Sequence, residues 1–299
     1  MTTRDPNDAW IDCRCGSRHW GAQGAAGLAL VDQATQTIAL QLRSASSHHG
    51  QTWALPGGAI GVGESAIDGA LREAREEAAI PATSVRPVAT RVLDHGDWSY
   101  TTVVASVVGQ QPDLLPLDGE SAALEWVALA DVVTYDLHPA FGQAWPDLLP
   151  LAAIRPAIVL DVANILGSRP NGWWRDRAGS TGLLLQQISN ALPDGLPAQW
   201  FGLNAELVWP EVIAVLEGAA RSATLPTETA LRYVHAADSG DDAIVKIATD
   251  VTAAPLAVVT ADRGLQSRLP QGSWGVSPRL FRDVVDAQQT WPGPHPGPK

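Results

Sequence analysis

Residues 58–80 read GAIGVGESAIDGALREAREEAAI and carry the densest chemistry in the chain. Ser65, with Asp68 three residues later, forms a capping box that predicts a helix from Ser65 to Ala79, and Pro81 stops the chain just beyond it. One face of this helix is apolar and is expected to be buried: Ile67, Ala70, Leu71, Ala74 and Ala78. The segment therefore predicts a helix with one buried and one acidic face.

The acidic face carries three carboxylates. Glu73, Glu76 and Glu77 stand at positions i, i+3 and i+4, so their side chains share one side of the helix. Like charges so close repel, and they are tolerated where a divalent cation neutralises them or where the face is well solvated. Gly57 and Gly58 just upstream allow a backbone carbonyl to reach the same cation. Hard oxygen ligands of this kind suit Mg²⁺ or Mn²⁺.

This segment resembles the Nudix box, whose pattern is Gly-x5-Glu-x7-Arg-Glu-U-x-Glu-Glu-x-Gly-U, with U an apolar residue. The matching positions are Gly58, Glu64, Arg72, Glu73, Ala74, Glu76, Glu77 and Ile80. Ala79 stands where the family has Gly, so we expect a slight shift of the helix end and unchanged metal ligands. The resemblance extends from about Gly24 to the strand that contains Glu125, and it implies an α/β/α sandwich with a mixed sheet.

The resemblance implies a hydrolase that cleaves a pyrophosphate bond in a nucleoside diphosphate joined to a group X. The three box glutamates would be catalytic and would bind Mg²⁺ or Mn²⁺ together with the Gly58 carbonyl. Glu73 is the candidate base for the attacking water. Arg72 would be structural, orienting a box glutamate, and Glu64 belongs to the same structural part of the box. The metal would activate water and neutralise charge on the phosphoryl oxygens.

The sequence indicates the substrate only through a few candidate residues. Trp53 and Trp98, with Tyr100, are candidates to stack on a base, and core packing is the alternative for at least one of them. Glu120 and Glu125 are candidates for a more distant metal ligand or base, with a surface position as the simpler interpretation of Glu120.

Two domains are expected from the distribution of strands and helices. The first half predicts strands at 24–32, 37–43, 53–58, 85–93, 100–108 and 122–127, and a closing helix at 139–151. The second half predicts strands at 157–161, 212–217, 231–236, 256–260 and 274–276, alternating with helices at 179–192, 241–252, 263–269 and 279–286. This alternation predicts a parallel sheet with helices on both faces. The expected domains are 1–153 and 154–288, followed by a Pro/Gly tail at 289–299.

Acidic residues fall where strands of the second half end. Asp161 ends the first strand, Glu217 ends the second, and Asp262 follows the strand at 256–260. Asp241 and Asp242 open the helix after the third strand, where the helix dipole alone would favour them. Because the carboxyl ends of parallel strands meet at one edge, we expect these chain-distant carboxylates to lie together there.

This ordered set resembles the NYN branch of the PIN-like nucleases over residues 155–287. The motifs are Asp161-Val-Ala-Asn164-Ile, Gly240-Asp241-Asp242-Ala-Ile244 and Thr260-Ala-Asp262-Arg263. The resemblance implies a ribonuclease whose metal ligands are Asp161, Asp241, Asp242 and Asp262. Asp161 and Asp242 would be catalytic, and Asn164 would bind a phosphate or a metal-bound water.

A loop after Asn164 combines cations with indoles. Arg169, Trp173, Trp174, Arg175 and Arg177 offer phosphate contacts and base stacking within one short stretch. Burial of the loop against its own domain is the alternative interpretation.

The chain has two cysteines, Cys13 and Cys15, and they are too close together for a disulfide framework. With His19 they look like part of a zinc knuckle. A structural zinc takes four ligands and three are local, so His48 or His49 is a candidate for the fourth. The alternative is a pair of reduced thiols beside a packed Trp20.

Composition limits the class of function. The chain has 299 residues, 45% of them hydrophobic and 17% charged, which is typical of globular proteins. Its net charge of −12 excludes a general polyanion binder. No apolar run approaches the roughly 20 residues of a membrane span, and the polar N-terminus does not resemble a signal peptide. We expect a soluble, cytoplasmic protein with no membrane partner; the sequence leaves its oligomeric state open.

The leading hypothesis is a bifunctional enzyme, a pyrophosphohydrolase of a nucleotide or nucleotide-derived substrate fused to a ribonuclease. The two halves would act on the same RNA, or separately on free nucleotides and on RNA. The alternative is a nucleotide-sensing domain that regulates a nuclease, with one half catalytically silent. The intact Glu73, Glu76 and Glu77 argue against a silent first half.

Overall fold

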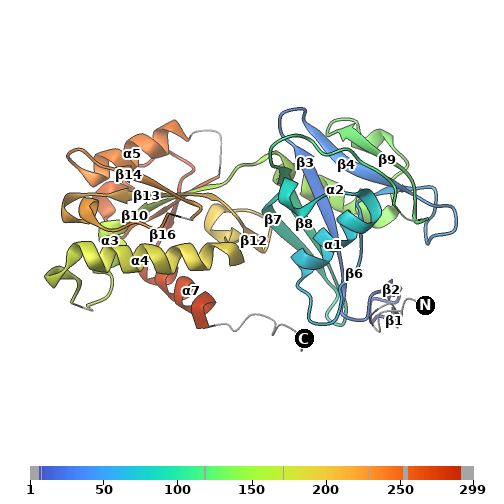
Figure 1. Ribbon diagram of the computed structural model, residues 1–299, viewed down its shortest axis with the longest axis horizontal. Coiled ribbons are helices and arrows are strands. Elements are labelled where there is room, and N and C mark those ends of the chain that lie inside the picture. Colours follow the sequence, from blue (N-terminus) through green and yellow to red (C-terminus); the bar gives the residue numbers. More distant parts are fainter. Residues whose placement is uncertain are drawn as a thin grey trace. The chain divides into compact units, whose positions relative to one another are not determined.

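The computed structural model describes residue 7 and residues 9–117, 119–170, 172–227, 229–251 and 255–290. The chain divides into two compact units, Met1–Ala153 and Ile154–Gly293 (Figure 1). The expected tail at 289–299 lies outside the described residues from 291 onward. Among the described residues, no helix is both long and apolar enough to cross a membrane.

The first unit is built on a mixed sheet. Its strands are β3 (Ala25–Asp32), β4 (Thr37–Arg43), β7 (Val85–Asp94), β8 (Ser99–Val107) and β9 (Ser121–Ala128). The pairing of β3 with β8 is parallel, whereas β3–β4, β7–β8 and β4–β9 are antiparallel. The mixed sheet expected for this half is confirmed.

The predicted strand at 53–58 is wrong in one respect, because two short strands take its place. β5 (Trp53–Ala54) pairs with β4, and β6 (Gly57–Ala59) pairs with β3. Pro56 lies between them and has no N–H to donate to a ladder, although its carbonyl accepts from the Leu28 N–H at 2.9 Å. The chain therefore changes partner strand at this point and brings the glycines of β6 beside β3.

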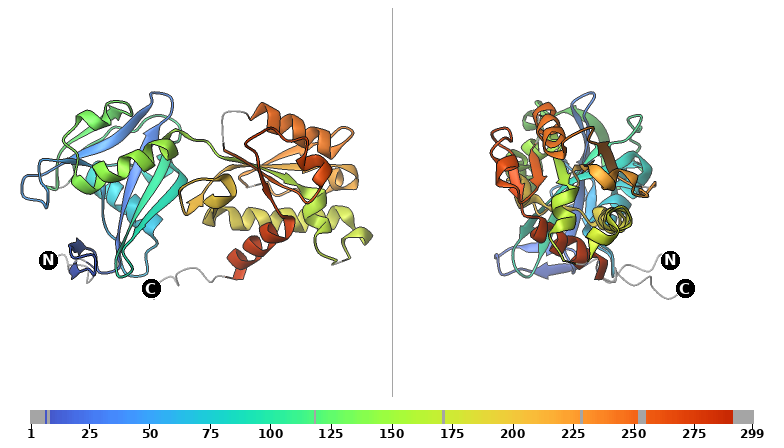
Figure 2. Two further views of the ribbon diagram at one scale, coloured as in Figure 1. Left: turned by 180° about the vertical axis from the view of Figure 1, so that it is seen from behind. Right: turned by 90° about the vertical axis from the view of Figure 1, so that its left-hand side faces the viewer.

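Helices cover both faces of this sheet. α1 (Ala66–Ala78) packs on β3 and β6, and α2 (Pro139–Ala153) packs on β7 and β8, on the opposite face (Figures 1 and 2). Under α1, every second residue of β3 joins a buried cluster with the helix: Ala26, Leu28, Leu30, Ala70, Ala74 and Ala78. The apolar face predicted for α1 is thus its buried face.

Both ends of α1 are capped. The Ser65 hydroxyl accepts the Asp68 N–H at 3.1 Å, as the predicted capping box requires. At the other end Ala79 has φ +58° and ψ 21°, and its N–H bonds the Arg75 carbonyl at 3.2 Å. Ala79 therefore adopts the left-handed conformation that favours glycine.

A small hairpin precedes this sheet and was not predicted from the sequence. β1 (Trp10–Asp12) pairs antiparallel with β2 (Arg18–Trp20), in a register that places Trp10 opposite Trp20. Each strand is too short to give a periodic pattern in the sequence. The only sequence signal of the hairpin is the Cys-x-Cys turn between its two strands.

The second unit is built on a parallel sheet. Its order is β14 (Leu231–His235), β13 (Glu211–Leu216), β10 (Ala157–Asp161), β15 (Leu256–Val259) and β16 (Trp274–Val276). Each of these pairings is parallel. The predicted parallel sheet is confirmed, and β10, the first strand of this unit, lies at its centre. Two further short strands, β11 (Leu196–Pro197) and β12 (Leu207–Val208), pair antiparallel.

The helices of the second unit lie on both sides of its sheet, as predicted. α5 (Gly240–Asp250) covers one face, while α4 (Arg177–Ala191) and α7 (Pro278–Thr290) pack together on the other (Figure 1). Two shorter helices follow strands at the carboxyl edge, α3 (Val162–Gly167) after β10 and α6 (Arg263–Gln266) after β15. The sequence did not predict α3, which is only six residues long.

Candidate active site

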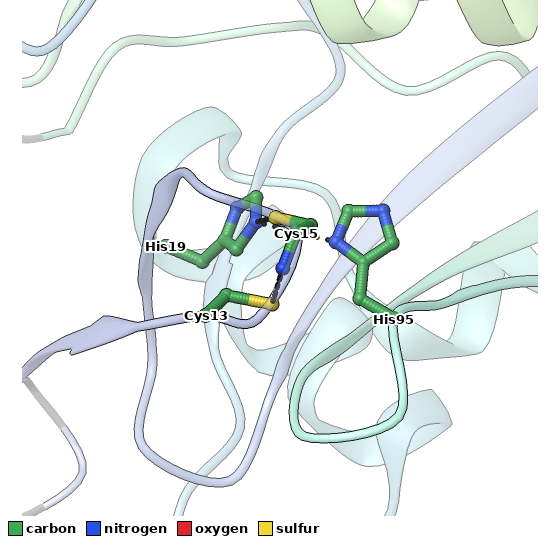
Figure 3. A group of neighbouring side chains, drawn as sticks. All are labelled: Cys13, Cys15, His19 and His95. Atoms are coloured by element: carbon green, nitrogen blue, oxygen red, sulfur yellow. Dashed lines mark hydrogen bonds between the residues drawn. The ribbon is translucent and has the colours of Figure 1, made fainter.

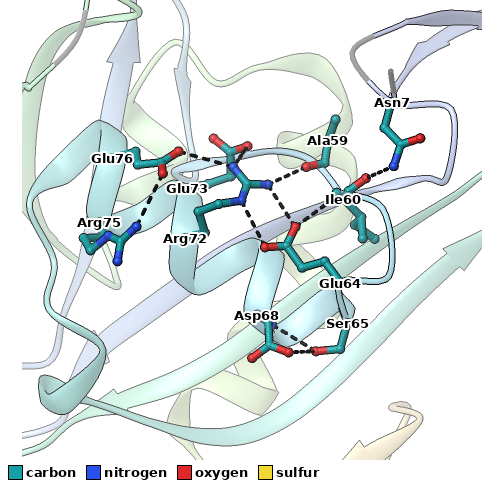
Figure 4. Close-up of polar contacts among 11 residues, drawn as sticks. Asn7, Ala59, Ile60, Glu64, Ser65, Asp68, Arg72, Glu73, Arg75 and Glu76 are labelled. Carbon is teal, nitrogen blue, oxygen red and sulfur yellow. Dashed lines mark hydrogen bonds and ion pairs between the residues drawn. The ribbon is translucent and has the colours of Figure 1, made fainter. Parts of the chain in front are cut away.

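Arg72 is the centre of a polar network on α1 (Figure 4). Its Nε donates to Glu64 Oε1 at 3.0 Å, and one terminal nitrogen donates to Glu64 Oε2 at 3.0 Å and to the Ala59 carbonyl at 2.8 Å. The other terminal nitrogen reaches Glu73 Oε1 at 2.8 Å and Glu76 Oε2 at 3.3 Å. One guanidinium thus fixes three carboxylates and the backbone of β6.

Glu64 is held in its ionised form. Burial alone would raise its pKa, but the hydrogen bonds from Arg72 and from the Gly61 N–H, at 2.7 Å, outweigh burial and hold the pKa below the ordinary value. The Gly61 contact is local to the loop before α1 and was not predicted. Glu64 therefore ties this loop to the helix.

Glu77 is the most deeply placed of the three helix carboxylates. Its side chain is 3% exposed, and Oε2 accepts the Gly57 N–H at 2.8 Å. A carboxylate in such a place needs a donor, and the glycine N–H supplies one. The sequence marked Gly57 only as a source of backbone freedom.

Glu73 lies against Gly58. A Cβ at position 58 would come within 2.6 Å of Glu73 Oε1, so only glycine lets the backbone of β6 approach this carboxylate. Burial raises the pKa of Glu73 and the charges of Glu76 and Glu120 raise it further, whereas Arg72 opposes the shift. The result is a half-buried carboxylate with a raised pKa beside the backbone of β6.

The aromatic candidates have different surroundings. Trp98 stacks on His19 with ring centroids 4.0 Å apart and donates its indole N–H to the Trp20 carbonyl at 3.1 Å, so one of its faces is covered by the hairpin. Trp53 packs edge-on against Tyr135 at 5.2 Å. The geometry therefore favours packing as the role of Trp98.

Trp53 has a link to a second candidate. Its neighbour Tyr135 donates to Glu125 Oε2 at 3.2 Å, so Trp53, Tyr135 and Glu125 form one continuous set of contacts from β5 to β9. Tyr100, in contrast, packs beneath the box: a Cβ on Gly27 would lie 2.1 Å from its hydroxyl oxygen. Burial raises the pKa of Tyr100, and the charge of Glu77 adds to this shift.

In the second unit, Asp161 is the central residue of the carboxyl edge of the sheet. It is 5% exposed, and Oδ2 accepts the Asn164 amide and the Thr260 hydroxyl, both at 2.8 Å. Oδ1 accepts the Asn164 N–H at 3.0 Å, which caps α3. Burial raises the pKa of Asp161 despite these hydrogen bonds, and Glu217 raises it further.

Asp241, and not Asp242, faces the other carboxylates. Burial raises the pKa of Asp241, and the charges of Asp161, Asp262 and Glu217 each raise it further. The Asp242 side chain is exposed and ion-paired with Arg268, which follows α6 in the chain. The sequence-based expectation names both residues as metal ligands and Asp242 as catalytic, because a helix start alone does not show which of two adjacent residues turns inward.

The remaining members of the acidic edge are held by local contacts. Asp262 caps α6, with Oδ1 accepting the Leu265 N–H at 2.9 Å. Glu217 accepts the Gly240 N–H at 3.1 Å, a contact that was not predicted for this strand-ending residue. A shallow cavity of about 480 Å³ adjoins this edge and is lined by Ala163, Asn164, Gly167, Ser168, Ala261, Ser277, Pro278 and Arg279.

The Arg/Trp loop packs in part on its own domain. Arg169 is ion-paired with Asp283 and Asp286 of α7. The Arg177 guanidinium lies 5.6 Å above the Trp173 ring. These contacts support the packing alternative for Arg169, Trp173 and Arg177. In contrast, Trp174 is 59% exposed and Arg175 is also exposed.

Comparison with known proteins matches residues 21–148 to the NUDIX domain. The "Nucleoside triphosphate pyrophosphatase/Nudix hydrolase fusion protein" of Bifidobacterium longum is 42% identical over 147 residues, covering 47% of this chain and 30% of that protein. The chain therefore spans about a third of that relative's length.

Two further proteins each match about half of the chain. The "Putative 8-oxo-dGTP diphosphatase 3" of Mycobacterium tuberculosis is 40% identical over 162 residues, covering 51% of this chain and 74% of that protein. The crystal structure of the Nudix hydrolase RenU from M. smegmatis is 37% identical, covers 49% of this chain and 95% of that chain, and aligns with a TM-score of 0.45.

Proposed function

The chain belongs to the Nudix family through its first unit, and from this we propose that it is a Mg²⁺- or Mn²⁺-dependent hydrolase of pyrophosphate bonds in nucleotides. The observation that carries the proposal is the arrangement around Arg72, which fixes Glu64, Glu73 and Glu76 together on one side of α1. An acidic helix face that was merely solvated would need no such support.

The side chains present fit a divalent cation. Glu73, Glu76 and Glu77 offer hard carboxylate oxygens, and the glycine at position 58 leaves room for the backbone beside Glu73, where a Cβ would lie 2.6 Å from Oε1. These three residues and the Gly58 carbonyl would hold Mg²⁺ or Mn²⁺. When bound, the ion would supply charge neutralisation on the phosphoryl oxygens and a lowered pKa for water.

The protein's own side chains have distinct proposed roles beside the metal ion. Glu73 is half-buried and burial raises its pKa, so it is the candidate to accept a proton from the attacking water. Arg72 and Glu64 keep that carboxylate and the β6 backbone in place. Glu77 is anchored by the Gly57 N–H, so its charge is fixed before the substrate arrives.

For the substrate, we propose nucleoside triphosphates, with oxidised purine deoxynucleotides tested first. The support is the 40% identity to the M. tuberculosis protein named as a putative 8-oxo-dGTP diphosphatase. Trp53 is the candidate to stack on the base, and Glu125, linked to it through Tyr135, is the candidate to contact the base or a second ion.

The test is a substrate screen with Mg²⁺ and with Mn²⁺. It compares 8-oxo-dGTP with ordinary NTPs and dNTPs, nucleotide sugars, ADP-ribose, dinucleoside polyphosphates and 5′-triphosphate RNA, and identifies the products by chromatography. Release of a nucleoside monophosphate and pyrophosphate from a triphosphate supports the proposal. Absence of turnover on every compound contradicts it and favours the nucleotide-sensing alternative.

For the second unit we propose a metal-dependent, PIN-like nuclease of the NYN type acting on single-stranded RNA. The observation in favour is the position of Asp161, Asp262, Glu217 and Asp241 at the carboxyl ends of β10, β15 and β13 and at the start of α5, where burial and the charges of the other three raise the pKa of Asp241. The carboxylates would hold Mg²⁺ or Mn²⁺, which would activate water for attack on a phosphodiester. Trp174 and Arg175 are exposed and available to contact RNA.

A further inference from the structure

Four metal-binding side chains converge between two hairpins of the first unit (Figure 3). Cys13, Cys15 and His19 come from the β1–β2 hairpin, and His95 comes from the turn between β7 and β8. One ligand atom from each lies within 4.8 Å of all the others. Neither the Nudix box nor the acidic edge contributes to this cluster.

The spacing of the ligand atoms fits a tetrahedral ion. Zn–S and Zn–N bonds of about 2.3 and 2.0 Å place neighbouring ligand atoms roughly 3.3–3.8 Å apart in a tetrahedron. The Cys15 Sγ–His19 Nε2 distance is 3.1 Å and the His95 Nδ1–His19 Nε2 distance is 3.2 Å. These atoms thus lie close to the spacing that a tetrahedral zinc ion requires.

His19 Nε2 faces both a sulfur and a second imidazole nitrogen. A single ring nitrogen either donates or accepts a hydrogen bond. His19 Nε2 can therefore hydrogen-bond to Cys15 Sγ and His95 Nδ1 only in one combination of protonation states of these groups. A cation bound by the sulfur and both ring nitrogens would be compatible with all of these neighbours at once. The ring of His19 is already fixed, because it stacks on Trp98 with an interplanar angle of 11°.

The fourth ligand differs from the sequence-based candidates. His48 and His49 form a separate group with His138 and are not part of the cysteine cluster, so their proposed part in it is wrong. His95 is 76 residues from His19 in sequence, and the pairing of β7 with β8 brings its turn beside the hairpin. Local spacing cannot reveal a ligand that comes from another hairpin.

The hairpin itself has a reason to need a metal. β1 and β2 have three residues each, and an isolated two-stranded hairpin is marginal in water. The Cys13–Cys15 turn has the backbone of a metal-binding loop: the Gly16 N–H bonds the Cys13 carbonyl at 3.0 Å, and the Cys15 N–H points to Cys13 Sγ at 3.5 Å. Small elements of this kind are commonly held by a structural ion.

We propose that Cys13, Cys15, His19 and His95 form a structural Zn²⁺ site that joins the β1–β2 hairpin to the β7–β8 turn. Two thiolates and two imidazoles complete a tetrahedral shell and leave no position for a substrate, so the site is structural and separate from the Mg²⁺ or Mn²⁺ of the box.

Binding is accompanied by loss of a proton from each thiol to solvent. The Cys13 thiol donates to Asp97 Oδ1 at 2.9 Å, and this hydrogen bond is lost when the sulfur binds the ion. Asp97 keeps its contacts to Arg14, whose N–H and Nε lie 3.0 and 3.2 Å from Oδ2. The carboxylate thus remains neutralised beside the thiolate.

The test uses the full chain purified without chelator or metal-affinity resin. Elemental analysis should find about one zinc per chain. Replacement by Co²⁺ should give the strong near-ultraviolet absorption of a thiolate–cobalt bond and visible bands of tetrahedral cobalt. Because this absorption requires sulfur, it reports the cysteine cluster and not the His48–His49–His138 group.

Two histidine variants separate the candidates for the fourth ligand. His95→Asn should weaken zinc retention by at least tenfold and alter the cobalt spectrum. His49→Asn is the matched control and should leave both unchanged. An unaltered spectrum in His95→Asn, or loss of the signal in His49→Asn, overturns the assignment.

A measurement on the wild-type chain tests the proposal even if the variants fail to fold. Slow removal of metal with a chelator should lower the melting temperature, and added Zn²⁺, but not Mg²⁺, should restore it. If the purified chain holds no zinc and takes up neither zinc nor cobalt, the cluster is a set of reduced thiols and imidazoles, and the proposal is wrong.

Discussion

Arg72 holds both carboxylate oxygens of Glu64, with its Nε 3.0 Å from Oε1 and a terminal nitrogen 3.0 Å from Oε2. The pair spans eight residues and closes the loop before α1 onto the helix. Lysine cannot reproduce this two-point contact, because its ammonium is a point charge on a flexible stem. The arginine therefore fixes geometry as well as charge.

We predict that Arg72→Lys lowers the free energy of unfolding by about 1–3 kcal/mol, since hydrogen-bonded carboxylates lose their partner. Chemical denaturation of Arg72→Lys, Glu64→Gln and the double variant measures the coupling. Because the two residues act as one unit, the double variant should cost clearly less than the sum of the single changes. Additive effects would show that the pair contributes nothing as a unit.

The same pair predicts a dependence of stability on pH. The folded-state pKa of Glu64 lies below its ordinary value of 4.5, so its ionised form contributes stability above that pH. As the pH falls below 4.5 and through the folded-state pKa, this contribution is lost. The Glu64→Gln variant should lose less stability than the wild type between pH 6 and about pH 3. Identical pH profiles of unfolding would contradict the shift.

Ala79→Gly should stabilise the first unit. Ala79 has φ +58°, a conformation that costs an alanine about 1 kcal/mol relative to glycine. Part of this gain is offset by the greater freedom of glycine in the unfolded chain, so we expect about 0.5–1 kcal/mol. The control is Ala74→Gly in the buried middle of the same helix, which should destabilise by about 1 kcal/mol or more. Thermal unfolding should show a higher melting temperature than the wild type for Ala79→Gly and a lower one for Ala74→Gly.

The sequence predicted the box because its information is local. Seven residues of spacing between Glu64 and Arg72 place them two helical turns apart, and the capping residues give the helix start. The contacts that complete the site come from backbone groups whose positions depend on strand pairing, and the sequence pattern does not reveal that pairing. The Gly57 N–H reaches Glu77 because β6 pairs with β3, whereas the preceding strand β5 pairs with β4.

The same distinction explains the second unit. The alternation of strands and helices was sufficient to predict a parallel sheet, and the carboxyl ends of its strands were sufficient to predict an acidic edge. Whether Asp241 or Asp242 faces that edge depends on the rotation of α5, which a first helical turn does not reveal. His95 was missed for a related reason, because its partners lie on a hairpin far away in sequence.

Glu77→Gln should reduce pyrophosphohydrolase turnover by at least tenfold, equivalent to about 1.4 kcal/mol in the barrier. The amide retains the shape and can still accept the Gly57 N–H through its oxygen, so the fold should survive. Glu76→Gln should act in the same direction. Glu206→Gln, an exposed residue of the second unit, is the control and should leave kcat unchanged. Full turnover in Glu77→Gln would remove this residue from the proposed metal site.

The final prediction concerns RNA cleavage by the full chain, which should require Mn²⁺ or Mg²⁺ and should stop in EDTA. Asp241→Asn removes a charge that faces Asp161, Asp262 and Glu217, so cleavage of single-stranded RNA should fall by at least tenfold. Asp242→Asn is the matched neighbour, and its side chain is exposed and paired with Arg268, so its activity should remain within about threefold of the wild type.

A contaminating nuclease would be affected by neither change, and this pair of variants therefore distinguishes it from cleavage by the chain itself. Glu73→Gln should leave RNA cleavage intact, because Glu73 belongs to the first unit and its proposed chemistry is pyrophosphate hydrolysis. Asp161→Asn is expected to abolish cleavage but also alters the cap of α3, so its melting temperature must be measured beside its activity. If Asp242→Asn is the more damaging of the two neighbours, the acidic edge is built on Asp242, and Asp241 only lies beside it.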